Sequence, residues 1–265
     1  MTAGVLAADE PFVDWSWVAD HTEEINEALR QHVQLTVTSV AIGFVISLVL
    51  GLVAVRWRWT YEPLAGICSV MYAVPSLALF AVLVSIPFFG LGYRTSLVAL
   101  VSYTLLILLR NIVAGLDGVP PAVREASDGM GYERWRRVLR VDLPLATPSI
   151  VAGLRIATVT TVGLVTVTAL VGEGGFGRLI NDGLSRDFST PIVVGTVGSV
   201  ALAITFDLAF VVVEWLITPW TRAKTPTGGV RGRTRADEAT AQTTPAAQAE
   251  KWTTLARETG GAVVR

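Results

Sequence analysis

Residues 124–144 form a polar, basic stretch between strongly apolar segments of the chain. The segment holds five arginines and reads as two short helices that meet at Gly131. Opposite charges one turn apart on a helix attract each other, and two such pairs are expected here: Arg124 with Asp128, and Glu133 with Arg137. These residue types indicate ionic contacts and the docking of a partner, not the making or breaking of bonds.

Proline and glycine define the elements that position these charges. Pro120-Pro121 suits a helix start, because the first turn does not need the N–H that proline lacks. The first helix is expected over residues 122–130 and ends at Gly131, which tolerates a left-handed backbone. A second helix over residues 133–139 is expected to stop at the prolines of residues 143–148. The pattern therefore predicts a short, stiff lever.

Catalytic constellations are missing from the sequence. No paired carboxylates, Ser/His/Asp set or Cys/His set falls in a plausible common plane, and His21 and His32 are too few and too far apart for a metal site. The only cysteine, Cys68, stands in an apolar run, so neither a disulfide framework nor a thiolate metal site is expected. We expect no catalytic residue, no metal and no cofactor on this chain.

Composition places the chain in a membrane. Of its 265 residues, 52% are hydrophobic and only 16% are charged, and the mean hydropathy is +0.54; soluble domains carry about 25% charge. The net charge of −1 gives no basic field for nucleic acid. Residues 1–10 lack the basic start and apolar core of a secretory signal, so insertion is expected to rely on internal spans.

Five apolar segments are long enough to cross a bilayer as helices, which takes about 20 residues. Helices are the only option, because an open sheet leaves backbone polar groups unsatisfied in lipid. We therefore expect an all-α polytopic membrane protein. The expected spans are residues 33–55, 63–87, 95–116, 149–171 and 191–218.

Positive charge sets the expected orientation, because cytoplasmic loops are rich in lysine and arginine. With the N-terminus outside, nine such residues fall in inner loops against four in outer ones. The loop 117–148 and the C-terminus are then cytoplasmic. In the external segment 1–32, Trp15 and Trp17 suggest an interfacial helix over residues 11–32. The polar, Thr- and Ala-rich tail 221–265 is expected to be disordered.

The charged loop resembles the EAA motif of ABC importer permeases. That motif has Glu-Ala-Ala, a glycine after three further residues, and Leu-Pro near its end. The matching residues are Glu125, Ala126, Ser127, Gly131, Leu143 and Pro144, with Ser127 in place of the motif's second alanine. The resemblance implies the five-helix core of a type I importer permease, in which these residues couple the helices to a cytoplasmic ATPase.

Flanking stretches resemble the glycine betaine, carnitine and choline permeases of osmoprotectant importers, over about Leu29–Leu216. The stretches that carry this likeness are Tyr93, Arg110-Asn111, Gly115-Leu116, Val119-Pro120-Pro121, Arg155-Ile156-Ala157 and Gly172–Gly177. Methionine and other amino-acid permeases share the loop and the core, so an amino-acid substrate is the alternative. A membrane channel is the alternative from another class, although the chain offers no selectivity ring.

The resemblance implies partners for transport across the cytoplasmic membrane. They are two cytoplasmic ATPase subunits, which bind ATP and Mg²⁺ in place of this chain, an extracytoplasmic binding protein, and a second copy or a related permease. The run Gly172–Gly177 lacks the Lys-Ser/Thr ending of a phosphate loop. It is expected to permit close backbone packing at the mouth of the pathway, to contact the binding protein, or simply to turn the chain.

Polar groups within the predicted spans are functional candidates, because charge in lipid is costly. Asp207 in span five is expected to pair with Arg155 in span four, or else to line the pathway. Pro75 should kink or break span two. Further pathway candidates are tyrosines that could contact quaternary ammonium groups or merely pack, with nearby polar residues. The full set is Tyr72, Pro75, Ser76, Tyr103 and Asn111.

Overall fold

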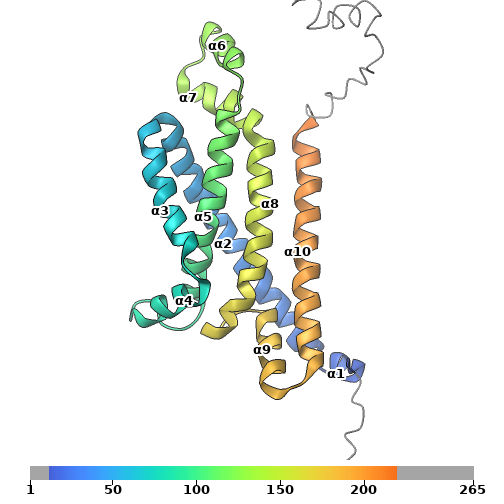
Figure 1. Cartoon of the computed structure of the whole chain (residues 1–265). Coiled ribbons are helices and arrows are strands. Elements are labelled where there is room, and N and C mark those ends of the chain that lie inside the picture. The colour runs from blue at the N-terminus through green and yellow to red at the C-terminus, as the bar shows by residue number, and fades with distance from the viewer. Residues whose placement is uncertain (1–11, 220–265) are drawn as a thin grey trace, which may run out of the picture. The chain divides into compact units, whose positions relative to one another are not determined.

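The computed structural model describes residues 12–219, and residues 12–218 of it form one helical unit (Figure 1). No strand occurs within these residues, so the predicted all-α class is confirmed for them. The predicted disordered tail, residues 221–265, and residues 1–11 lie outside the described part. The helices are α1 (Trp15–Asp20), α2 (Thr22–Arg56), α3 (Tyr61–Ala73), α4 (Ser76–Ser85), α5 (Tyr93–Asp117), α6 (Pro121–Gly129), α7 (Arg134–Arg137), α8 (Leu143–Val167), α9 (Phe176–Arg186) and α10 (Ser189–Ile217).

Four helical stretches of the described chain are long and apolar enough to span a membrane. They are α2, α5, the stretch Arg134–Val171 that contains α8, and α10. A bent pair, Arg58–Ala73 followed by Ser76–Ser85, gives a fifth if it is counted as one broken span. The five apolar segments read from the sequence all fall on these helices.

The N-terminal region differs from the prediction of an interfacial helix over residues 11–32. Only α1 is separate, and from Thr22 onward the chain is already part of α2, which runs for 35 residues. Residues 22–32 contain no proline or glycine that would end a helix, so the helix simply begins earlier than the predicted span. At about 1.5 Å per residue, α2 is near 50 Å long and exceeds the hydrocarbon thickness. Its N-terminal turns therefore extend beyond the apolar layer.

Asp14 caps the short helix α1. Its carboxylate accepts hydrogen bonds from the Ser16 hydroxyl and from the Ser16 and Trp17 backbone N–H groups, and the Ser16 hydroxyl bond lowers the pKa of Asp14 most. The Asp14 backbone N–H in turn donates to the hydroxyl of Thr190 at the start of α10, 2.9 Å away. The beginning of the described chain is thus tied to its last helix.

The predicted break at Pro75 is confirmed. Helix α3 ends at Ala73, Val74 and Pro75 are extended, and α4 leaves at 94° to α3. Proline lacks the N–H that would continue the helix, and its ring disfavours a helical conformation at the preceding residue. The Tyr103 hydroxyl on α5 donates to the Val74 carbonyl at 2.6 Å, so the break is satisfied within the protein.

Helix α5 lies at the centre of the bundle, against α2, α3 and α8. Its residues Leu108, Leu109 and Ile112 are fully buried. Glycines allow the close approach: an added Cβ at Gly51 of α2 would lie 2.6 Å from the Ile112 side chain. By contrast, only 6% of the most apolar window of α10 is buried, against 56% in α5. The outer face of α10 is therefore left for lipid or for another protein.

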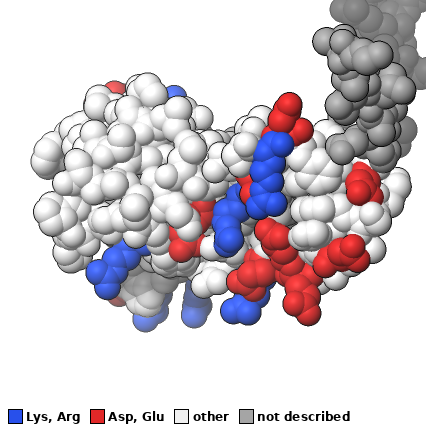
Figure 2. Space-filling view, turned by 90° about the horizontal axis from the view of Figure 1, so that it is seen from below, with Lys and Arg blue, Asp and Glu red and all other residues white. Residues whose placement is uncertain are grey.

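The two ends of the bundle carry different elements. Figure 1 places α6 and α7 at one end and α1 and α9 at the other. Figure 2 looks at the α1 and α9 end and shows acidic side chains gathered on part of this face, with basic ones beside them. The first turns of α2 expose Glu23, Glu24 and Glu27. This end therefore presents a charged, water-compatible surface.

The expectation that the second loop helix stops at the prolines is wrong. Helix α7 continues through a π-helical turn, Val138–Asp142, directly into α8. Pro144 falls at the start of α8, where the wider turn accommodates its missing N–H donor. The loop helix and the span are one continuous helical stretch.

Candidate functional site

Helix α6 presents the first part of the charged loop to solvent. It begins at Pro121, as predicted, and Glu125 and Ala126 lie on its exposed face. Ser127 points inward, is 2% exposed, and donates from its hydroxyl to the Val123 carbonyl at 2.7 Å. The predicted coupling residues therefore divide into two that a partner can reach and one that anchors the helix.

Gly131 ends α6 in the left-handed conformation that the sequence predicted, with φ of +81°. The Gly131 N–H donates to the Asp128 carbonyl at 3.0 Å, and the Tyr132 N–H donates to the Ser127 carbonyl at 3.2 Å. This bonding pattern is a Schellman cap, which satisfies the last carbonyls of the helix. The turn between α6 and α7 is therefore fixed by the backbone itself.

The ion pairs of the loop are not the ones expected from helical spacing. Asp128 bonds Arg137 of α7 at 2.6 and 2.7 Å, instead of Arg124 on its own helix. Arg124 lies 3.7 Å from Asp142 and donates to the Leu116 carbonyl at the end of α5. Likewise, the Glu133 carboxylate lies 3.8 Å from Nε of Arg136, and its expected ion pair with the Arg137 side chain is not formed. The charges tie different elements together, because the turn at Gly131 folds α7 back toward α6.

Asp142 is a site residue that the sequence reasoning missed. It lies in the π-helical turn, is 3% exposed, and stands 3.6 Å from Nε of Arg137 as well as near Arg124. A hollow of about 240 Å³ adjoins it, also lined by Arg56 and Arg134. A buried carboxylate between two arginines joins α6, α7 and α8 into one unit. The sequence signal that could have identified Asp142 was a carboxylate two residues before Pro144, at the start of an apolar span.

Apolar side chains surround the exposed face of the loop. Met130 is 69% exposed, Trp135 58% and Leu139 54%. Exposed apolar groups rimmed by charge are typical of protein–protein contact sites. At the other end of the motif, Leu143 is half-buried and packs against the cluster that includes Leu116 of α5. The motif thus has one end open to a partner and one end set in the core.

The pathway candidates fall into two groups, residues with packing contacts and residues that are exposed or border a hollow. Tyr103 is 5% exposed and satisfies the helix break, while Asn111 donates to the Ile107 carbonyl at 2.8 Å and packs against Gly153 of α8. These contacts are those of packing residues. Tyr72 and Pro75 are exposed, and Tyr72 meets Tyr103 edge-on, with ring centroids 5.9 Å apart. Ser76 borders a hollow of about 350 Å³, with Thr166, Gly177 and Asn181 among its other residues.

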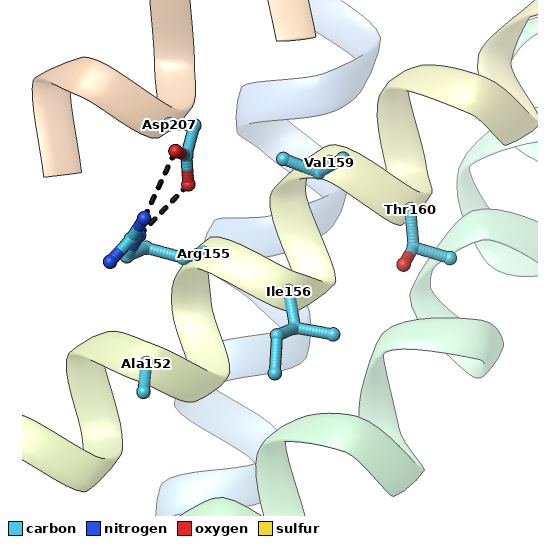
Figure 3. A pocket seen from close by; sticks show the side chains of 6 residues that line it. All are labelled: Ala152, Arg155, Ile156, Val159, Thr160 and Asp207. Carbon is cyan, nitrogen blue, oxygen red and sulfur yellow. Dashed lines mark hydrogen bonds and ion pairs between the residues drawn. The ribbon is translucent and has the colours of Figure 1, made fainter. Parts of the chain in front are cut away.

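The predicted ion pair between Arg155 and Asp207 is present. Nε of Arg155 donates to Oδ1 of Asp207 at 2.8 Å, and its Nη2 donates to Oδ2 at 3.0 Å. Figure 3 shows the Arg155 side chain reaching from α8 to Asp207 on α10 beside the other residues of a hollow of about 420 Å³. A bidentate pair of this kind is strong and directional. It fastens the two helices at mid-span.

The glycine run Gly172–Gly177 packs closely against other elements. An added Cβ at Gly175 would lie 2.5 Å from the Ala28 carbonyl oxygen, and one at Gly177 would overlap the Thr166 carbonyl. The Gly175 N–H donates to Oε1 of Gln31 at 3.0 Å. Close backbone packing, one of the expected roles, is therefore observed. Helix α9, which begins at Phe176, was not expected.

A family model described as binding-protein-dependent transport system inner membrane component matches residues 28–218. The match covers well over half of the chain. The chain belongs to this family. It is thus a permease subunit of an ABC importer, which is an inner-membrane component and not itself an enzyme.

Curated relatives match the permease over most of its length. It is 33% identical to the osmoprotectant import permease protein OsmW of Salmonella typhimurium over 208 residues, 77% of this chain and 96% of that protein. It is 34% identical to the choline transport system permease protein OpuBB of Bacillus subtilis over 189 residues, 71% of this chain and 86% of that protein. These relatives extend the likeness well beyond the charged loop.

Solved structures show the same fold. A chain of the inward-facing MetNI methionine ABC transporter has a TM-score of 0.66 at 22% identity, and covers 75% of the permease and 98% of its own length. A chain of an amino acid ABC transporter with histidines has a TM-score of 0.65 at 17% identity, with 76% and 98% covered. At these identities the likeness concerns the fold alone, which is that of type I importer permeases.

Proposed function

We propose that this permease carries osmoprotectants, the small quaternary ammonium compounds that include glycine betaine, carnitine, choline and proline betaine. The observation that carries the proposal is the 33% identity to an osmoprotectant import permease over 96% of that protein's length. Relatives named for choline and carnitine transport, at 31–34% identity, support the same substrate class. The likeness to methionine and amino-acid transporters supports only the fold.

In the proposed assembly, two permease chains flank one pathway. The second is another copy or a related permease, and the outer face of α10 is free to meet it. Two ATPase subunits, which hold ATP and Mg²⁺, dock on the α6–α7 loops, and an extracytoplasmic binding protein delivers the substrate. The N-terminus is then outside and the C-terminus inside. The arginines at the α6–α7 end support this orientation.

In the proposed coupling step, ATPase closure pushes α6 through Glu125 and Ala126. The movement passes along α7 into α8, because the two are one continuous helical stretch. Ser127 and Gly131 keep α6 and its turn rigid, while Leu143 and Pro144 set the start of α8 in the core. Closure of the motor then switches the pathway between inward-facing and outward-facing states.

The test is uptake of labelled glycine betaine after a salt upshift. Cells lacking the chain are compared with cells that express it together with its ATPase and binding-protein partners. We expect uptake that requires the chain and is inhibited by unlabelled choline or carnitine. Inhibition by methionine, with none by quaternary ammonium compounds, would leave the chain a permease but replace the proposed substrate class.

A further inference from the structure

The Arg155–Asp207 pair lies where charge is costly. Arg155 stands midway along α8, and Asp207 is well inside α10. Ionisable groups at such depth face protein or a water-filled cavity, because lipid does not solvate them. The Arg155 side chain is nevertheless 32% exposed on this chain and that of Asp207 is 38% exposed. In the assembled transporter the exposed side must therefore face water or another protein chain.

That exposed side opens into a hollow large enough for a small molecule. Its volume is about 420 Å³, and small-molecule sites are typically about 300–1,000 Å³. Helix α8 contributes small and branched side chains to its wall, and Figure 3 shows them beside the ion pair: Ala152, Ile156, Val159 and Thr160. The hollow thus combines an apolar wall with one strongly polar edge.

The charges at this edge of the hollow do not balance once Glu214 is counted. Asp207 occupies Nε and Nη2 of Arg155, and Nη1 makes no hydrogen bond to any described residue. The carboxylate nearest to Nη1 belongs to Glu214, at 3.9 Å, which is beyond hydrogen-bonding distance. One guanidinium therefore meets two carboxylates. The Nη1 donor of Arg155 therefore lies beside one net negative charge.

We propose that Arg155, Asp207 and Glu214 form a transit site for zwitterionic substrates, which carry a carboxylate and a quaternary ammonium group in one molecule. This inference rests on the proposed function. Nη1 of Arg155, which makes no hydrogen bond to Glu214 at 3.9 Å, donates to the substrate carboxylate. The quaternary ammonium has no N–H and needs only negative charge nearby, which Asp207 and Glu214 supply.

The lining also explains why such a site releases its ligand. The six residues around the hollow include no aromatic ring, so the cation–π contacts of an aromatic cage are absent from this part of the described chain. Binding depends on charge alone, and the charge of Arg155 is already shared with Asp207 and Glu214. A weak site of this kind passes a substrate on and does not retain it.

The test uses the complete transporter in proteoliposomes, with uptake of labelled glycine betaine and labelled choline measured side by side. Choline has the quaternary ammonium group but no carboxylate. We expect Arg155→Gln to lower glycine betaine uptake at least tenfold and choline uptake less than threefold. Glu214→Gln should lower both. Arg155→Lys, which keeps a positive charge beside Asp207 but loses the Nη1 donor, should show the same selectivity and serves if Arg155→Gln fails to assemble.

A purely structural pair makes a different prediction. The double variant R155D/D207R restores an ion pair with reversed direction, and we expect it to assemble without recovering glycine betaine uptake. Recovery to near the wild-type rate, or an equal loss of both substrates in Arg155→Gln and Arg155→Lys, would overturn the transit site. Uptake of choline but not of glycine betaine by the wild-type transporter would also overturn the transit site. Wild-type uptake of neither compound would remove the proposed function as well.

The matched control is the Arg58–Asp117 pair, which has a comparable bond of 2.7 Å but lies away from the hollow. Arg58→Gln should leave the ratio of the two uptake rates unchanged. A change in that ratio equal to the one in Arg155→Gln would show that loss of any such ion pair alters selectivity, and would also contradict the transit site.

Discussion

The carboxylate of Asp142 lies 3.6 Å from Nε of Arg137, almost fully buried where the charged loop becomes α8. Arg137 in turn holds Asp128 at the end of α6. The loop is therefore connected to the span both along the backbone and through a row of charges. In the proposed coupling step, a partner that moves α6 therefore moves α8 with it.

The Asp142→Asn substitution tests this connection. Asparagine keeps the shape of the side chain but removes the charge that compensates Arg124 and Arg137, and loss of one partner from a buried ion pair costs about 3–5 kcal/mol. We expect the transporter to keep ATPase activity but to import much less substrate per ATP hydrolysed. Both rates are measured on the same proteoliposomes.

Asp128→Asn is the control for this substitution. The Asp128 side chain is 54% exposed, and exposed ion pairs contribute only about 0–1 kcal/mol. Its effect on the number of substrates imported per ATP should therefore be clearly smaller. Equal losses in the two variants would show that burial of Asp142 has no special role in coupling.

Gly131→Ala should destabilise the loop, whereas Gly129→Ala should not. At both positions an added Cβ meets no atom within 4 Å, so the two differ only in backbone conformation. Gly131 has a φ of +81°, where a side chain costs about 1–2 kcal/mol. Gly129 is helical, where alanine is favoured over glycine by up to about 1 kcal/mol.

Thermal unfolding and uptake of the two glycine variants provide the measurement. We expect a lower unfolding temperature and weaker uptake for Gly131→Ala only. If both variants behave alike, the left-handed turn does not limit the function of the loop.

Local sequence signals predicted the parts of this fold that depend on local chemistry. Pro75 breaks span two because proline lacks the backbone N–H donor in any context. Gly131 ends α6 because glycine itself tolerates the left-handed backbone that this turn needs. The Arg155–Asp207 pair was also predictable, since two charges in apolar spans have few other partners. The candidate docking face of α6 followed from the spacing of the motif.

Features that depend on distant contacts could not be predicted in the same way. Asp128 pairs with Arg137 and not with Arg124 because the turn brings α7 back toward α6. The spacing of residues along a helix does not predict this turn. Asp142 became a site residue only when the π-helical turn buried it between two arginines. Helix α9 was missed because its starting point is set by the close packing of the glycine run against other elements.

Tyr103→Phe should weaken the break in span two. The hydroxyl of Tyr103 is the donor to the half-buried Val74 carbonyl at 2.6 Å. A fully buried carbonyl left without its donor costs about 1–3 kcal/mol, which is an upper range for this contact. We expect a lower unfolding temperature for the detergent-solubilised transporter. Tyr93→Phe is the control, because the Thr38 hydroxyl that it contacts also donates to the Gln34 carbonyl. A drop of the same size in both variants would contradict a special role for the Val74 contact.

Gly177→Ala should be more harmful than Gly172→Ala, although only Gly172 has a positive φ, of +90°. A Cβ at Gly172 meets nothing within 4 Å, so its cost is limited to backbone strain of about 1–2 kcal/mol. At Gly177 the added atom overlaps the Thr166 carbonyl, which belongs to the backbone of α8 and cannot rotate away. Overpacking of this kind typically costs about 1–3 kcal/mol or more, and here it also forces α9 away from α8. Thermal unfolding of the two variants should therefore rank Gly177→Ala lower. The reverse order would mean that the run serves as a turn, with no need for close contact between these helices.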